Sequence, residues 1–269
     1  MDKSVYAIVV KLVAGGAMPA NPSSGRLVHA AFLDIIHQIN PSLAKAFHDL
    51  NERKLFTVSP LWAERGFVRL GDVAFVRFAF LDPALAHLFV EQFLLAPHHH
   101  TLRIGPAPFA ITEVYATSTS HERAGKMVLE LPSENECFEQ ARFEFLTPTA
   151  FSRKRGAKAE YLTDFSPIDV WKHIRRVWGR ITSEDPGPVF DEWCADHTQV
   201  IHQSTRRVQL DFGGYFVPGV MGSFTYRLSD YTPGEILHRW WCGLAQFAPY
   251  VSVGYKATMG MGQCAVQVK

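Results

Sequence analysis

The stretch Val5-Tyr-Ala-Ile-Val-Val-Lys-Leu-Val13 is rich in valine and isoleucine and predicts a buried β-strand. After a turn-forming segment, 26–39 carries apolar residues at helical spacing, and Asn40-Pro41 separates it from a second short helix over 42–50. The next stretches predict strands over 55–62 and 67–80, the latter folded back at Gly71-Asp72, a helix over 82–95 and a strand over 102–115. The first half of the chain therefore follows the order strand, helix, strand, strand, helix, strand.

A similar order recurs in the second half. Residues 143–145 lie in a predicted strand, and 167–181 predicts a helix with Trp171, Ile174 and Trp178 on one face. The following stretches predict a hairpin of 204–216 with 219–228 around Val217-Pro-Gly, a helix over 233–247 and a strand over 263–268. A βαββαβ unit that occurs twice is the plan of two tandem ferredoxin-like domains, so the predicted fold class is α+β.

The predicted domains span 1–120 and 140–269, and the polar, turn-rich stretch 117–140 connects them. A chain of 269 residues has room for two domains of ordinary size. Its 47% hydrophobic and 20% charged residues are typical of a globular protein and argue against a disordered or fibrous one. Because the net charge is only +1, a polyanionic partner must be held by a local patch of charge.

The cysteines are widely spaced in the sequence and predict reduced thiols of a cytosolic protein. They are Cys137, Cys194, Cys242 and Cys264. No signal peptide is visible, and no apolar run approaches the roughly 18 residues that span a bilayer. We therefore expect a cytoplasmic protein without a membrane partner.

A glycine loop, Gly254-Tyr-Lys-Ala-Thr-Met-Gly-Met-Gly262, lies between the last predicted helix and the last predicted strand. Glycine permits positive φ and close approach of the backbone, and exposed amides beside Lys256 suit an anion such as phosphate. The loop lacks the order of a P-loop and does not join a strand to a helix, as a dinucleotide fingerprint does. The alternative is a tight turn before the C-terminal strand.

A second motif is His48-Asp-Leu-Asn-Glu-Arg-Lys54-Leu-Phe-Thr-Val-Ser59-Pro, at the end of a predicted helix and before a predicted strand. His48 and Lys54, six residues apart, can lie over one reactive phosphate. Histidine exchanges protons near neutral pH, and lysine neutralises charge that develops on phosphate oxygens. The alternative is that His48 caps the helix and Lys54 is a solvated charge.

A basic run follows the middle of the chain, with four cations in six residues. They are Arg153, Lys154, Arg155 and Lys158. Such a run is either a solvated loop or a clamp for the phosphates of a nucleic acid. Arg175, Arg176 and Arg180 of the next predicted helix would extend the same patch.

The other histidine and cysteine groups do not predict a metal site. His98-His-His100 are adjacent in a loop, and Cys194 with His197 and His202 lacks the second ligand pair of a structural zinc site. The aromatic K/R-G-F/Y-G/A-F sequence of RNA-recognition sheets is absent too.

Together, the His48–Ser59 block, the segment Phe145-Leu-Thr-Pro-Thr-Ala-Phe151 and the glycine loop occur in an order that resembles one family. They look like the CRISPR repeat-processing endoribonucleases of the repeat-associated RNA-binding superfamily, and the resemblance covers nearly the whole chain. It implies a cut in the repeat RNA of a CRISPR precursor transcript without metal or other cofactor. In that chemistry the ribose 2′-hydroxyl attacks the adjacent phosphate and leaves a cyclic phosphate.

The resemblance also assigns roles to residues of the active site. His48 matches the family's general acid/base histidine, and Lys54 falls where several members carry a lysine. Leu33 stands where some members have a tyrosine, so a Tyr–His pair is not available there. Proton transfer then rests on His48 alone or is helped by Arg26, His29 or Ser59. Among these, Arg26 ranks first because a guanidinium can bind phosphate through two hydrogen bonds.

In the second domain, the resemblance implies that the glycine loop contacts the RNA backbone or shapes the cleft between the halves. The residues concerned are Gly254, Lys256, Gly260 and Gly262. Ser252 stands where members often have a further glycine. The expected partner is CRISPR repeat RNA; other effector subunits remain an open alternative, and both a monomer and a homodimer fit.

Two other functions stay open at this point. One is an RNA-binding subunit of the same superfamily that holds guide RNA without cutting it. The other is a cytosolic enzyme that binds the phosphate of a small molecule at the glycine loop.

Overall fold

The computed structural model describes residues 3–49, 55–95, 101–155 and 158–269. The chain divides into two compact units. Unit 1 contains Met1–Met127 with Thr258–Gly260, and unit 2 contains Val128–Ala257 with Met261–Lys269. Each unit combines an antiparallel β-sheet with helices, which confirms the predicted α+β class.

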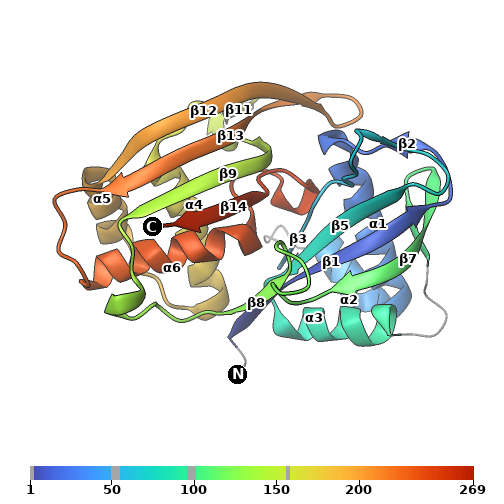
Figure 1. The fold of residues 1–269 in the computed structure, drawn as a ribbon, viewed down its shortest axis with the longest axis horizontal. Helices are drawn as coiled ribbons and strands as arrows, with labels where there is room; N and C mark the ends of the chain where they lie inside the picture. Colours follow the sequence, from blue (N-terminus) through green and yellow to red (C-terminus); the bar gives the residue numbers. More distant parts are fainter. Residues whose placement is uncertain (1–2, 50–54, 96–100, 156–157) are drawn as a thin grey trace. The chain divides into compact units, whose positions relative to one another are not determined.

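Unit 1 is built on β1 (Ser4–Ala14), the central strand of a sheet with the order β3-β5-β1-β7-β6 (Figure 1). The other strands of this path are β3 (Phe56–Val58), β5 (Val73–Phe80), β6 (Thr101–Ile104) and β7 (Ala107–Tyr115). A further strand, β8 (Gly125–Val128), pairs with β1. The stretch 117–140 is therefore more than a connection, because part of it completes the first sheet.

The helices of unit 1 begin close to the residues at which the sequence predicts them. The first is α1 (Gly25–Ile39), which follows a short 3-10 turn at Pro22–Ser24. Asn40 then caps α2 (Pro41–Asp49), since its side-chain oxygen accepts a 3.0 Å hydrogen bond from the amide of Leu43. Asp82 caps α3 (Pro83–Phe89) in the same way, and a π-helical turn continues it over Val90–Leu94.

The predicted strand over 67–80 divides into two pieces that do not pair with each other. A short β4 (Phe67–Val68) pairs with β2 (Met18–Pro19), whereas β5 joins the main sheet. Gly71 lies between them with a φ of +86°, a conformation that glycine adopts without a Cβ clash.

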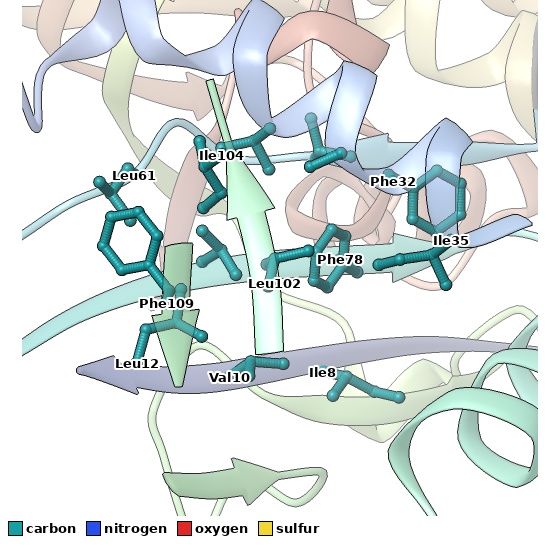
Figure 2. Packing of buried hydrophobic residues seen from close by; sticks show 14 of the residues in the cluster. Ile8, Val10, Leu12, Phe32, Ile35, Leu61, Phe78, Leu102, Ile104 and Phe109 are labelled. Carbon is teal, nitrogen blue, oxygen red and sulfur yellow. The ribbon is translucent and has the colours of Figure 1, made fainter. Parts of the chain in front are cut away.

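The core of unit 1 lies between the sheet and its helices. Alternate residues of β1, namely Ile8, Val10 and Leu12, lie on the same side as Phe32 and Ile35 of α1 (Figure 2). All five are at most 3% exposed. The two-residue period of the strand and the 3.6-residue period of the helix thus meet in one apolar layer.

Unit 2 contains a four-stranded sheet with the order β12-β13-β9-β14 (Figure 1). Its strands are β9 (Gln140–Thr149), β12 (Thr198–Asp211), β13 (Phe216–Leu228) and β14 (Cys264–Val268). The helices are α4 (Pro167–Thr182), α5 (Pro188–His197) and α6 (Ile236–Val251). Short 3-10 turns occur at Glu134–Glu136 and Ala257–Met259.

The core of unit 2 is aromatic. The predicted apolar face of α4 is confirmed, because Trp171, Ile174 and Trp178 are all fully buried. The indole of Trp171 stacks on that of Trp241 from α6, with ring centroids 5.0 Å apart and planes at 13°. Both indole N–H groups are satisfied, that of Trp171 by the carbonyl of Trp241 and that of Trp241 by the hydroxyl of Thr198.

The hairpin of β12 and β13 turns at a different place from the predicted one. Val217-Pro-Gly219 lies inside β13, and the turn is at 212–215, where Phe212 donates its amide to the carbonyl of Tyr215. Gly213 and Gly214 there have φ values of +75° and +141°. Adjacent glycines supply the positive φ angles that short hairpin turns require, so they outweigh the proline signal.

The main strands follow the same order in both units. The main strands are β1, β3, β5 and β7 in unit 1 and β9, β12, β13 and β14 in unit 2. Numbered in this order within each unit, the second strand pairs with the third, the third with the first and the first with the fourth. Among the described residues, no helix is long and apolar enough to cross a membrane.

Candidate nucleic-acid interface

The glycine loop is held by close packing of its own backbone. A Cβ atom on Gly254 would lie 2.4 Å from the carbonyl oxygen of Ala150, and one on Gly262 would lie 2.0 Å from that of Val253. Both glycines have positive φ, +94° and +71°. A side chain at either position is therefore excluded by sterics as well as by backbone conformation.

Several amides of the loop donate to carbonyl groups of the protein. The amide of Tyr255 donates to Ala150, that of Met261 to Lys256 and that of Gly262 to Pro148, at 2.7, 3.3 and 3.1 Å. The expected row of amides that point at an anion is thus replaced, at these three positions, by internal hydrogen bonds. These three amides are therefore bound within the protein, and both expected roles of the glycines stay predictions.

Lys256 lies in the middle of the loop with a φ of +54°, unusual for a residue with a side chain. Its ammonium is 4.7 Å from the ring centroid of Phe212, 5.3 Å from that of Tyr255 and 5.5 Å from that of Tyr215. Burial, with a hydrogen bond to Tyr161, raises the pKa of Tyr255 to about 12. Tyr255 is neutral at physiological pH, as an unperturbed tyrosine also is, and its ring attracts the lysine through its quadrupole.

In unit 1, the first turn of α1 lies against residues 258–260. A Cβ atom on Gly25 would lie 2.2 Å from the carbonyl oxygen of Met259, and one on Gly260 would lie 2.9 Å from the Cα of Gly25. Arg26 is the next residue of this turn, and its side chain is exposed. The structure thus brings two predicted site residues, Arg26 and Gly260, to the same end of α1.

Two of the three expected helpers of His48 are buried. His29 is 6% exposed and stacks on the ring of Phe56, with centroids 5.8 Å apart. Ser59 is 0% exposed; its hydroxyl donates to the carbonyl of Pro60 and accepts from the amide of Arg77, both at 2.8 Å. Burial argues against a direct contact of either side chain with a substrate. Of the expected arrangements, His48 alone and His48 helped by Arg26 stay predictions.

The predicted catalytic residues, His48 and Lys54, are only partly described. His48 lies in the last turn of α2, but its side chain is outside the described residues. Lys54 is outside them altogether. Their expected roles stay predictions.

The basic run forms a hairpin of its own and is not a loop. Its strands are β10 (Phe151–Arg155) and β11 (Lys158–Leu162), in which Arg153 pairs with Glu160 and Arg155 with Lys158. The guanidinium of Arg153 is largely exposed and lies 3.3 Å from the carboxylate of Asp169. Such an exposed ion pair contributes little to stability, so the guanidinium can leave this carboxylate and bind another anion. The side chains of Lys154, Arg155 and Lys158 are outside the described residues.

Arg175 does not belong to this surface, contrary to the sequence prediction. It is 5% exposed, and its Nε and Nη2 lie 2.9 and 3.2 Å from the two carboxylate oxygens of Asp191. A further ion pair joins it to Asp185. Because these partners occupy the guanidinium in the interior, Arg175 stabilises the contact between α4 and α5. Arg176 and Arg180 are exposed, as expected.

One group of side chains could hold a metal ion by distance alone. The ligand atoms of Cys137, His238 and Cys242 lie within 4.8 Å of one another, beside a cavity of about 300 Å³. However, Nδ1 of His238 accepts a hydrogen bond from the amide of Gly234, so the ring proton is on Nε2, which lies 3.0 Å from the carbonyl oxygen of Phe138. Neither nitrogen then offers a lone pair to a metal, and the histidine reads as a structural residue.

Sequence reasoning missed the aromatic residues beside Lys256. Phe212, Tyr215 and Phe216 flank the turn between β12 and β13. The available signal was the pair Gly213-Gly214 between aromatic residues, which predicts a short hairpin turn with the rings at its tip.

Models of protein families match both parts of the chain. "CRISPR Cas6 N-terminal domain" matches residues 4–68, and "CRISPR-associated endoribonuclease Cas6" matches residues 143–264. A curated relative, the CRISPR-associated endoribonuclease Cas6 of Mycobacterium tuberculosis (strain H37Rv), is 34% identical over 132 residues. That match covers 47% of this chain and 38% of the relative, so the chain spans well under two thirds of the relative's length.

Solved structures match the chain over almost all of its length. The Cas6 (TTHB231) product complex is 25% identical, with a TM-score of 0.80 over 98% of this chain and 100% of the other. Thermus thermophilus Cas6 (TTHB231) is 24% identical, with a TM-score of 0.72 over 98% of each chain. Because the second structure is only 24% identical to this chain, its similarity is evidence of the fold alone.

Proposed function

Because the chain belongs to the Cas6 family of CRISPR-associated endoribonucleases, we propose that it cuts CRISPR precursor transcripts within their repeats to make guide RNAs. The observation that carries this proposal is the match of Cas6 models to both parts of the chain. The matched segments contain the His48 block and the glycine loop. The likeness to a Cas6 product complex over the whole chain adds support.

The proposed reaction needs no metal ion. The ribose 2′-oxygen forms a bond to the adjacent phosphorus as the bond from phosphorus to the 5′-oxygen breaks. One proton leaves the 2′-hydroxyl and one is added to the 5′-oxygen, so the products are a 2′,3′-cyclic phosphate and a free 5′-hydroxyl. No oxidant, reductant or water is consumed in this step.

His48 transfers a proton in the proposed step, either from the 2′-hydroxyl or to the 5′-oxygen. A positioned general acid or base supplies about 10²- to 10⁴-fold in rate. Lys54 and Arg26 neutralise the charge that builds up on the phosphate oxygens. The exposure of Arg26 in the first turn of α1 supports this role, and a guanidinium can bind phosphate through two hydrogen bonds.

Unit 2 provides the proposed grip on the RNA backbone. The cations proposed for this grip are Lys256 in the glycine loop and four residues of the β10–β11 hairpin, Arg153, Lys154, Arg155 and Lys158. Gly254, Gly260 and Gly262 fix the conformation of the loop. Since net charge is only +1, this grip depends on local concentration of cations.

We also propose that the two units are tandem ferredoxin-like domains, at about 1–120 and 140–269. The support is the strand order, since second-third-first-fourth with antiparallel pairing is the order of an antiparallel βαββαβ sheet.

A second candidate function is an RNA-binding subunit of an effector complex that does not cut. Leu33, half-buried against the core of unit 1, favours it, because some members of the family carry a tyrosine there.

The test is cleavage of end-labelled repeat RNA from the source organism in excess chelator. We expect the wild type to make a single cut and His48→Ala to lose at least about 100-fold in single-turnover rate, with nearly unchanged affinity. His37→Ala removes an exposed histidine from α1 and serves as the matched control, which should cut normally. Tight binding without a cut by any of the three proteins would make the chain an RNA-holding subunit.

A further inference from the structure

The hairpin of β12 and β13 ends in an aromatic tip, formed by Phe212, Tyr215 and Phe216. Its turn is fixed by two hydrogen bonds: the amide of Phe212 donates to the carbonyl of Tyr215 at 3.0 Å, and the amide of Gly213 donates to the carboxylate of Asp211 at 2.7 Å. Positive φ values at both central glycines complete a tight turn. The tip is therefore a shaped element with a defined backbone.

Two rings of the tip, those of Tyr215 and Phe216, are exposed, and that of Phe212 is half-buried. Tyr215 is 45% and Phe216 64% exposed, and among the side chains that the structure describes, Phe67 is the other aromatic residue this accessible. The rings of Phe212 and Tyr215 stack nearly parallel, with centroids 5.6 Å apart and planes at 15°. A two-ring stack with an accessible member can be continued by a third flat ring.

A small apolar cluster connects the tip to the glycine loop. It consists of buried Ala150, Leu210, Val217 and Met261, and Phe212 and Tyr255 pack against it. Leu210 and Val217 form a register pair of the hairpin, two residues below the turn on one strand and two on the other. The hairpin below the rings is therefore held by packing, so a base that stacks on them loses little free energy to the ordering of the protein.

A positive charge lies beside the stack. The ammonium of Lys256 is 4.7 Å from the centroid of Phe212 and 5.5 Å from that of Tyr215. An occupant of this surface must then present a flat ring and a negative charge within a few ångströms of each other. A nucleotide does so, because its base and its phosphate are joined through one ribose.

We propose that the aromatic tip stacks on an unpaired base of the bound RNA while Lys256 contacts a neighbouring phosphate; the identity of this RNA as repeat transcript rests on the function proposed above. Bases inside a duplex have their faces covered by their neighbours, so the tip selects a single-stranded flank or loop. Because any base can stack on a ring, we expect the tip to distinguish unpaired from paired RNA and not one base from another.

The test uses repeat RNA that carries 2-aminopurine at successive unpaired positions, together with Tyr215→Ala, Tyr215→Phe and Phe67→Ala. We expect wild type to change the fluorescence of one position through stacking. Tyr215→Ala should remove this change and weaken binding roughly tenfold, whereas Tyr215→Phe, which keeps the ring, should restore both. Phe67→Ala, an exposed aromatic residue of unit 1, should behave like wild type.

An abasic nucleotide at the responding position gives the second arm. It should weaken binding to wild type and leave the affinity of Tyr215→Ala unchanged, because both changes remove the same contact. Equal losses with both proteins would overturn the proposal. So would a variant that binds all RNAs normally but changes the oligomeric state, since the tip would then be a protein interface.

Cleavage at saturating RNA separates this proposal from the function. The cut and the fluorescence change are therefore both measured for the wild-type protein on the same RNA. If wild type binds and stacks but never cuts, the proposed nuclease fails and the stacking site stands. If wild type cuts but no 2-aminopurine position changes its fluorescence on binding, the proposed stacking site fails and the proposed nuclease stands.

Discussion

Arg175 and Lys256 are both cations of unit 2, but they lie in different surroundings. Arg175, between α4 and α5, is bound by Asp191 and Asp185 in the interior. Lys256, in the glycine loop, has its ammonium beside three aromatic rings. A carboxylate binds a cation by its opposite charge, whereas a neutral ring attracts the cation through its quadrupole.

The comparison teaches that a cation's contacts, more than its position in a basic stretch, decide whether it is expected to bind RNA. Arg175 follows the basic run in the sequence, but its guanidinium is bound in the interior and stabilises the fold. Lys256 stands nearly alone in the sequence and is presented by a loop whose glycines are needed for packing. The predictions below separate residues that fold unit 2 from residues that it presents.

The largest effect should come from the interior pair. Asp191→Ala leaves the guanidinium of Arg175 with only the partly exposed Asp185, so we expect a loss of about 3–5 kcal/mol in free energy of unfolding. Glu192→Ala, at the exposed neighbouring position, should change it by less than about 0.5 kcal/mol. Denaturant unfolding of both variants measures the difference; equal losses would show that the buried pair is not special.

A smaller effect should separate the packing role of a loop glycine from its conformation. Gly262→Ala combines a φ of +71° with a contact of 2.0 Å to the carbonyl oxygen of Val253, and we expect it to cost about 2–3 kcal/mol. Gly71→Ala has a similar φ of +86° but open space around its Cβ, so about 1 kcal/mol is expected. Thermal unfolding that places the two variants together would remove packing as the reason for Gly262.

The smallest effect is expected for the presented lysine. Lys256→Ala should weaken repeat-RNA binding by about fivefold and reduce the slope of log K against log salt by about one, because one phosphate contact is lost. Binding titrations from low to moderate salt measure both quantities. A variant with the wild-type slope would take Lys256 out of the RNA contact.

The sequence predicted the elements where a local pattern decides the structure. The face of α4 formed by Trp171, Ile174 and Trp178 follows from helical spacing alone, and the caps Asn40 and Asp82 lie where their side chains can accept a backbone hydrogen bond. The glycine loop was found as a special backbone, although not as one held by its own packing.

The sequence failed where distant residues decide. Nothing near Arg175 reveals that Asp191 will reach it from the next helix, so its charge was read as exposed. Ser59 and His29 looked available because their burial depends on the opposing sheet and helix. The hairpin turn was misplaced for a local reason, since Pro218 was weighed above the pair Gly213-Gly214.

The positions of the tryptophans, of which Trp171, Trp178 and Trp241 are described above, also determine what an optical measurement of this protein reports. Five of the six, Trp171, Trp178, Trp193, Trp240 and Trp241, belong to unit 2, and Trp62 belongs to unit 1, where the guanidinium of Arg123 lies 4.4 Å from its ring centroid. Intrinsic fluorescence is therefore dominated by one half of the chain. The indoles of Trp171 and Trp241 are packed against each other in the core of unit 2, so near-ultraviolet circular dichroism should report mainly the packing of that unit.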